Sequence, residues 1–134
     1  MTDIKKIEGI GDKFHSKLSA LGISTMNKLL EEGSTPSGRR NLEKQTGISP
    51  KLILRWVNMA DLFRIKGIGE EYSDLLEAAG VDTVPELAQR RADNLFAKMK
   101  EVNQSRKLVR QLPGEAQVYE WIAQAKSLDR KVNY

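Results

Sequence analysis

The sequence predicts an all-α protein of about eight helices, arranged as two tandem units with pseudo-twofold internal repetition. Apolar residues recur at helical spacing along the chain, and strand-like alternation is nearly absent. The pentapeptide Ile-Glu-Gly-Ile-Gly at residues 7–11 returns as Ile-Lys-Gly-Ile-Gly at residues 65–69. We name these segments the first and second glycine turns. A repeat of this kind indicates that each copy is one supersecondary unit.

The repeat extends well beyond the two glycine turns. At an offset of 58 residues, nine of the 24 positions from 7 to 30 are identical: Ile7, Gly9, Ile10, Gly11, Leu18, Ala20, Gly22, Thr25 and Leu29 in the first copy. Trp56 and Ala60 match Trp121 and Ala125 at an offset of 65, so the second copy carries extra residues, approximately 99–111. We therefore divide the chain into units 1–64 and 65–134 of one compact domain.

Helix start and stop signals place four helices in the first unit. A helix at 12–21 carries Phe14, Leu18 and Leu21 on one stripe, and Gly22 ends it. Ser24 or Thr25 caps a short helix that Gly33 ends. Proline at a first helical position opens the other two, at 36–46 and from about residue 50.

The second unit repeats this plan. Helices are expected at 70–79, from residue 84 after Thr83, at 91–103 and at 115–128. Trp56 and Trp121 fall at matched helical positions and are expected in the core. The residues after Asp129 are expected to be frayed.

Composition favours a soluble, cytoplasmic protein. No apolar run approaches the ~20 residues that a membrane helix needs, so no membrane partner is expected. The chain has no cysteine, which excludes disulfides and thiolate metal sites. Its net charge of +4 lies entirely in residues 1–64, which hold eleven Lys and Arg against seven Asp and Glu. This excess is a modest indication of an anionic partner.

The glycine turns have a chemistry that suits phosphate. Glycine permits positive φ and close approach of another backbone, and both glycines of each turn are expected to be needed for this. The following helix leaves its first N–H groups without intrahelical partners, and the helix dipole adds partial positive charge. The product is a preformed cradle for an anion.

Both glycine turns resemble the helix-hairpin-helix motif. The residues that carry this resemblance are 7–11 with Phe14 and Leu18, and 65–69 with Tyr72 and Leu76. The full chain, including ADLFRIKGIG at 60–69 and QVYEWIAQA at 117–125, also resembles a bacterial family known only as a domain of unknown function and grouped with helix-hairpin-helix domains. The resemblance implies contact with the DNA backbone without sequence reading; the alternative is that the turns only pack helices.

The two turns differ in charge. Lys13, Lys17 and Lys28 of the first unit correspond to Glu71, Leu75 and Glu86 in the second. The predicted DNA-backbone site therefore consists of Gly9, Ile10, Gly11, Lys13 and Lys17. The second glycine turn, with Lys66, Gly67, Ile68 and Gly69, is a weaker candidate because Glu70, Glu71 and Asp74 would repel phosphate.

Other polar clusters leave their alternatives open. His15 is expected at the surface or its boundary, and Glu70-Glu71 is interpreted as an acidic helix start rather than a metal site. Arg39 and Arg40 either contact phosphate or are solvated. The same alternatives hold for Arg106, Lys107 and Arg110.

These patterns predict a non-enzymatic DNA-binding module. The sequence contains no nucleophile–base pair, Walker loop or dinucleotide fingerprint, and no cofactor or metal is expected. The expected partner is duplex or branched DNA, bound through backbone amides and lysines. The alternative is a protein-interaction or scaffold module that keeps the fold without binding DNA. A third possibility is an accessory subunit of a nuclease or repair enzyme.

Overall fold

The computed structural model describes residues 3–7 and 9–134, and within them the chain is all-helical with no β-strand. The eight α-helices confirm the predicted fold class. A short 3₁₀ helix, η1 (Ile4–Lys6), precedes them and was not predicted. One isolated bridge, between Asp3 and Thr25, fixes this segment beside the start of the second α-helix.

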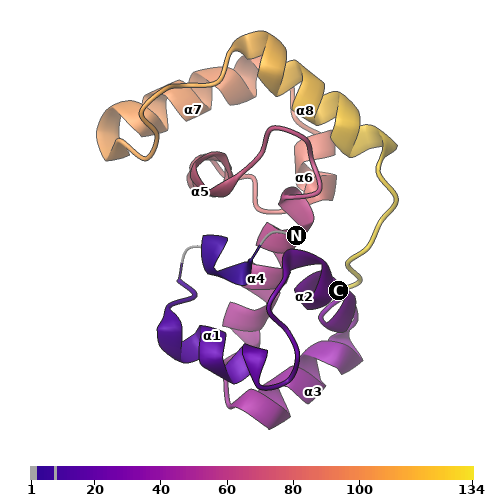
Figure 1. Ribbon diagram of the computed structural model, residues 1–134. Helices are drawn as coiled ribbons and strands as arrows, with labels where there is room; N and C mark the ends of the chain where they lie inside the picture. Colours follow the sequence, from indigo (N-terminus) through magenta and orange to yellow (C-terminus); the bar gives the residue numbers. More distant parts are fainter. Residues whose placement is uncertain (1–2, 8) are drawn as a thin grey trace. The chain divides into compact units, whose positions relative to one another are not determined.

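The chain forms two compact units (Figure 1). The first extends to Asp61 and also includes Arg130–Tyr134; the second is Leu62–Asp129. In the first part of the chain the α-helices are α1 (Asp12–Ser19), α2 (Met26–Glu32), α3 (Pro36–Thr46) and α4 (Pro50–Leu62). The second unit contains α5 (Glu70–Ala78), α6 (Val84–Ala88), α7 (Ala92–Arg106) and α8 (Glu115–Ser127).

Threonine side chains set several helix starts. Thr25 accepts a hydrogen bond from the Lys28 N–H at 3.2 Å, and Thr83 accepts the equivalent bond from the Glu86 N–H at 3.1 Å. Thr35 does the same for α3, where Pro36 occupies the first turn. Each hydroxyl satisfies a donor that the helix itself leaves unpaired. These starts agree with the sequence prediction.

The additional residues of the second unit lengthen α7 and form the loop that follows it. Lys107 ends α7 in the left-handed conformation at φ 51°, and its N–H donates to the Asn103 carbonyl. Figure 1 shows the loop leaving the end of α7 and running back toward the start of α8. Within this unit α7 packs against α5 and α8.

Each unit has an apolar core beneath its glycine turn. Leu18 and Leu76 are buried, and Trp56 and Trp121 are 0% and 1% exposed, as predicted. Leu21 is 37% exposed, so its expected place in the α1 stripe is wrong. The reason is that α1 ends at Ser19, before the helical stripe reaches that residue.

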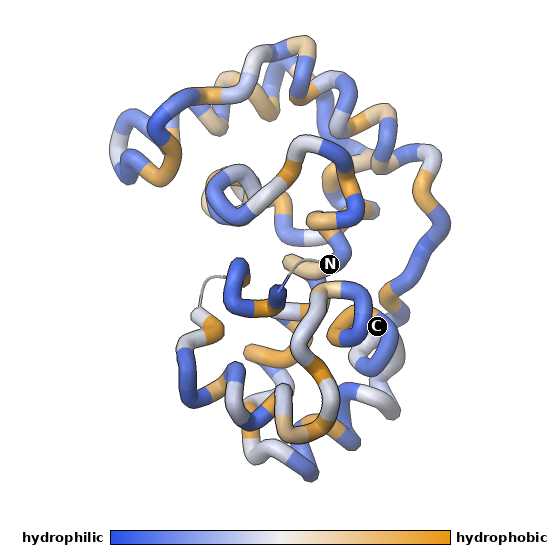
Figure 2. Tube along the Cα trace, in the orientation of Figure 1, coloured by the Kyte–Doolittle hydropathy of each residue, from blue (hydrophilic) through white to orange (hydrophobic). Residues whose placement is uncertain are grey.

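Apolar and polar residues alternate in short blocks along the helices, as Figure 2 shows. This is the pattern of amphipathic helices, each with one side in a core. Among the described residues, no helix has both the length and the apolar character that crossing a bilayer requires.

The expectation of a frayed C-terminus is wrong. Val132 is 2% exposed, and the Asn133 N–H donates to the Ser34 carbonyl at 2.8 Å. The buried Arg39 guanidinium donates to the carbonyls of Gly33 and Asn133, both at 2.8 Å. These bonds hold the last residues against the first unit, through contacts too distant in sequence for local patterns to reveal.

We predict that Leu18→Ala and Leu76→Ala each lower the free energy of unfolding by about 2–5 kcal/mol, because each removes fully buried methyl groups. Chemical denaturation followed by tryptophan fluorescence measures the loss. Leu21→Ala is the matched control and should cost less than about 0.5 kcal/mol, as surface substitutions do. Equal losses at all three leucines would contradict the assignment of the cores.

Candidate nucleic-acid interface

The first glycine turn is closed by one backbone hydrogen bond. The Ile10 N–H donates to the Ile7 carbonyl at 3.2 Å, and Gly9 has φ +96°. Ile7 and Ile10 are buried, whereas Gly9 and Gly11 are exposed. Glu8, which the sequence resemblance includes, lies outside the described residues. The two isoleucines thus fix the turn to the core with its glycines at the surface.

The second glycine turn has the same local geometry. The Ile68 N–H donates to the Ile65 carbonyl at 3.1 Å, and Gly67 also has φ +96°. Both isoleucines are again buried and both glycines exposed. The structural repetition of the complete units stays a prediction; these matched turns support it locally.

A buried tryptophan lies under each turn. The Trp56 ring packs on Phe14 with centroids 5.2 Å apart, and the Trp121 ring packs on Tyr72 at 5.3 Å. A Cβ atom added at Gly67 would lie 2.9 Å from Trp121 Nε1, and one added at Gly9 would lie 3.5 Å from Trp56 Nε1. The inner glycine of each turn is therefore required by its positive φ, and at Gly67 by the indole beneath it as well.

The outer glycines do not have the conformation expected from the sequence. Gly11 has φ −86° and Gly69 has φ −113°, both in the extended region that any residue adopts. A Cβ atom added at either position would meet nothing within 4 Å. The expectation that both glycines of each turn need positive φ is thus wrong for Gly11 and Gly69.

The outer glycines lie at helix starts that no side chain caps. Gly11 precedes α1 and Gly69 precedes α5, and neither helix has a side-chain hydrogen bond at its cap. The next N–H groups lack intrahelical acceptors, as at every α-helix start. Each outer glycine therefore starts a helix without a side-chain cap, and a side chain at its position would enter open space.

The first glycine turn is accompanied by exposed cations. Lys13 and Lys17 lie four residues apart on α1, both are exposed, and neither forms an ion pair within the described part of the chain. Asp12, the nearest described carboxylate in sequence, lies 3.2 Å from the Lys5 ammonium. Both side chains are more than half exposed, so this surface pair compensates only part of the Asp12 charge.

Arg55 is a candidate residue that the sequence analysis missed. It lies on α4, and its Nη1 atom is 3.3 Å from the position of a Cβ atom at Gly9. The side chain is half-buried. Only its adjacency to the predicted core residue Trp56 could have suggested this placement, because α4 and the turn are far apart in sequence.

The second glycine turn is held by its own unit. Gln124 of α8 accepts a hydrogen bond from the Lys66 N–H at 2.9 Å and donates one to the Lys66 carbonyl at 3.3 Å. At the offset of 65 that relates the tryptophans, Gln124 corresponds to Met59, which is buried and has no amide group. The Lys66 peptide groups are consequently already satisfied, in a way that Met59 cannot reproduce.

Acidic residues surround the start of α5. Glu70 and Glu71 occupy its first turn and are exposed, as the sequence predicted. Carboxylates are favourable there because they face the positive end of the helix dipole. The same charges disfavour phosphate at Gly67, Ile68 and Gly69.

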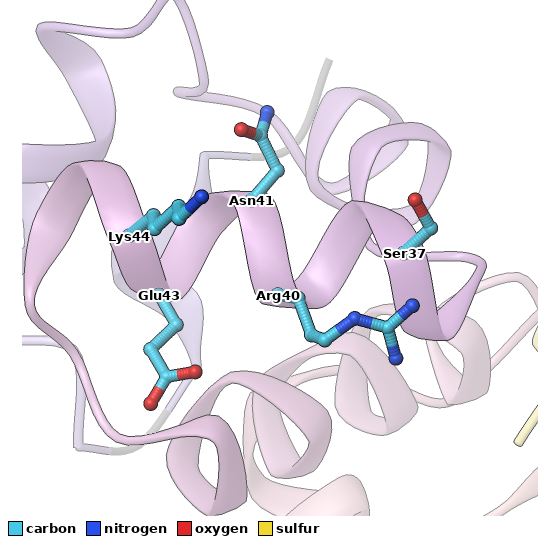
Figure 3. Close-up of a pocket in the computed structure, with 5 residues that line it drawn as sticks. All are labelled: Ser37, Arg40, Asn41, Glu43 and Lys44. Atoms are coloured by element: carbon cyan, nitrogen blue, oxygen red, sulfur yellow. The ribbon is translucent and has the colours of Figure 1, made fainter.

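The remaining candidates have structural or surface positions. His15 is half-buried, with Nε2 3.3 Å from the Asp3 carboxylate. Arg39 is buried and bonded to carbonyls, so neither alternative expected for it is correct. Arg40 lies on the exposed side of α3, beside a shallow depression lined by Ser37, Asn41, Glu43 and Lys44 (Figure 3). Residues 3–7 and 9–134 contain no cluster of three potential metal ligands.

Comparison with known proteins identifies one family. The model of a family described as a domain of unknown function, DUF4332, matches residues 8–128. No curated protein matches the chain. No solved structure matches it either.

The two glycines of one turn should respond differently to alanine. We expect Gly67→Ala to lower the free energy of unfolding by at least about 1–2 kcal/mol, because Gly67 has positive φ and the new methyl group would lie against Trp121. Gly69→Ala should cost less than about 1 kcal/mol, since its φ suits any residue. Thermal unfolding measures both; a larger loss for Gly69→Ala would contradict the assignment.

Proposed function

We propose that this chain, which belongs to the DUF4332 family over residues 8–128, is a non-enzymatic DNA-binding module. It contacts duplex phosphates through the backbone of Gly9 and Gly11 in the first glycine turn, which the Ile10 N–H closes by donating to the Ile7 carbonyl. Lys13 and Lys17 flank the bound backbone and neutralise part of its charge. The supporting observation is Gly11, a glycine that the fold itself does not require.

The environment of Gly11 supports an external ligand. Its φ is accessible to any residue, and a side chain there would enter open space. A Ser, Thr, Asp or Asn at this position would cap α1, as Thr25 caps α2. Glycine leaves those donors unpaired and removes the steric barrier to a phosphate oxygen. This combination favours close approach from outside.

The charge distribution also favours the first unit as the one that binds DNA. When Arg130–Tyr134 is counted with the first unit, that unit holds twelve Lys and Arg against seven Asp and Glu, a net charge of +5. The second unit holds ten against eleven, a net charge of −1. A positive unit attracts a polyanion and accelerates its association.

Binding of this kind is independent of base sequence. Backbone amides and lysines reach phosphate oxygens, which are the same at every nucleotide. Reading of bases requires an element in a groove with side chains on base edges. The proposed contacts include no such element.

A protein-docking role is the second candidate, and the second glycine turn favours it. Its Lys66 peptide groups are occupied by Gln124, and Glu70 and Glu71 stand at the helix start. A surface of this kind suits a basic protein partner better than a nucleic acid. The two roles require different units and can be tested separately.

Gly11→Asp separates binding from folding. Aspartate is a favourable N-cap and its charge suits a helix start, so the melting temperature should be unchanged or higher. The same carboxylate would lie where the phosphate is proposed to bind, and we expect duplex affinity to fall at least about tenfold. Fluorescence anisotropy with a labelled duplex measures the affinity.

Gly69→Asp is the matched control. It makes the same chemical change at the second helix start and should leave affinity within about twofold, in accordance with the electrostatic argument. If folded Gly11→Asp binds duplex DNA as the wild type does, the first glycine turn is not the phosphate site. The protein-docking role would then be favoured.

Neutralising two lysines tests the charge contribution. We expect Lys13→Gln with Lys17→Gln to make the negative slope of log K against log salt shallower by roughly 2. Each lost phosphate contact reduces the magnitude of this slope by about 0.9. The control is Lys66→Gln with Lys126→Gln; like the first pair, it removes one cation near a glycine turn and one in a last helical turn. Equal slopes for the two double variants would indicate diffuse attraction instead of a local site.

A further inference from the structure

The loop after α7 carries cations that do not belong to the phosphate site proposed at the first glycine turn. Arg106, Lys107 and Arg110 lie within five residues, and all three are exposed. None of them has a carboxylate partner among the described residues. Three of the ten cations of a unit with net charge −1 thus lie in one short segment.

The segment is held in a defined conformation. The Asn103 side chain accepts a hydrogen bond from the Val109 N–H at 3.0 Å and donates one to the Val109 carbonyl at 3.2 Å. Val109 is buried, which fixes the middle of the segment to the core. The Tyr72 hydroxyl donates to the Gln111 carbonyl at 3.1 Å and attaches the far end to α5. The cations therefore stand on a fixed loop and not on a free tail.

Lys107 occupies a backbone conformation that favours glycine. Its φ is +51°, and it is the one non-glycine residue with positive φ in the described part of the chain. Glycine at this helix end would fit the same conformation without a side chain. The backbone conformation therefore does not itself select lysine, although the C-terminal end of the α7 dipole favours its positive charge.

The chemistry of the segment suits phosphate more than an apolar partner. The exposed large hydrophobic residues among those described are Leu21, Tyr119 and Tyr134, and none belongs to residues 98–112. Protein interfaces depend on buried aromatic or apolar anchors, and interfacial membrane binding depends on inserted apolar side chains. Unpaired cations without such anchors match a nucleic-acid backbone.

We infer that residues 106–111 form a second phosphate-binding surface for duplex nucleic acid. Arg106, Lys107 and Arg110 contact backbone phosphates, while Asn103 and Tyr72 hold the loop that presents them. This inference rests on the proposed function, since the ligand is the same duplex. It assigns the contribution of the second unit to this loop and not to the second glycine turn.

The test is a triple variant, Arg106→Gln, Lys107→Gly and Arg110→Gln, in the full chain. Lys107→Gly relieves the positive φ, so the melting temperature should be maintained. With a labelled duplex, we expect the negative slope of log K against log salt to become shallower by roughly 2–3. We also expect the affinity at low salt to fall at least about tenfold.

The control removes the same total charge elsewhere, through Lys51→Gln, Lys126→Gln and Lys131→Gln. All three are exposed and lie outside the loop. Equal losses in the two triple variants would overturn the inference, because they would indicate attraction by net charge alone. Unchanged binding by the loop variant would overturn it as well. Competition by polyglutamate as effective as competition by unlabelled duplex would replace nucleic acid with an acidic protein.

The two sites are distinguished by comparison with the Lys13→Gln, Lys17→Gln variant. If only the loop variant loses duplex affinity, the site at the first glycine turn is overturned and the loop is supported. If only the lysine variant loses duplex affinity, the loop is overturned and the first glycine turn is supported. Loss of affinity in both variants supports both sites, whereas a wild-type chain that binds no duplex overturns both.

Discussion

The contact on which each unit depends is a positive-φ glycine lying on a buried indole. In the first unit Gly9 lies over Trp56, and in the second Gly67 lies over Trp121. The indole packs at the same time on an aromatic residue of the helix after the turn, Phe14 in one unit. One ring therefore joins the turn, the following helix and the last long helix of the unit. Among the described residues, neither indole N–H has a hydrogen-bond acceptor.

The two units share this buried contact but differ in the residues around their glycine turns. On α8, Gln124 occupies both peptide groups of Lys66, whereas its counterpart on α4 is the buried Met59. The chain segment that returns to the first unit also increases the charge contrast, because it brings Arg130 and Lys131 with it. Packing thus explains what the two glycine turns share, and the exposed residues around them explain why we propose phosphate binding only at the first turn.

Most of the fold follows from local signals in the sequence. Thr25, Thr83 and the prolines at first helical positions determine helix starts through bonds within a few residues, so the predicted bounds agree closely with the structure. The return of Val132 to the first unit and the burial of Arg39 depend on contacts between segments about ninety residues apart. Such contacts have no local signature. The same reason hides Arg55, whose relation to Gly9 arises only when α4 packs under the turn.

The predicted site stays a prediction, but the conformational reason given for its glycines was partly wrong. Two glycines were expected to serve one conformational purpose, but only the inner glycine of each turn has positive φ. The outer glycines must be explained differently, and nothing within the described structure explains Gly69. At Gly11 an explanation is available, because open space, uncapped amides and unpaired lysines coincide there. A glycine that the fold does not need is informative only where the surrounding charge also favours a ligand, and this condition separates the first glycine turn from the second.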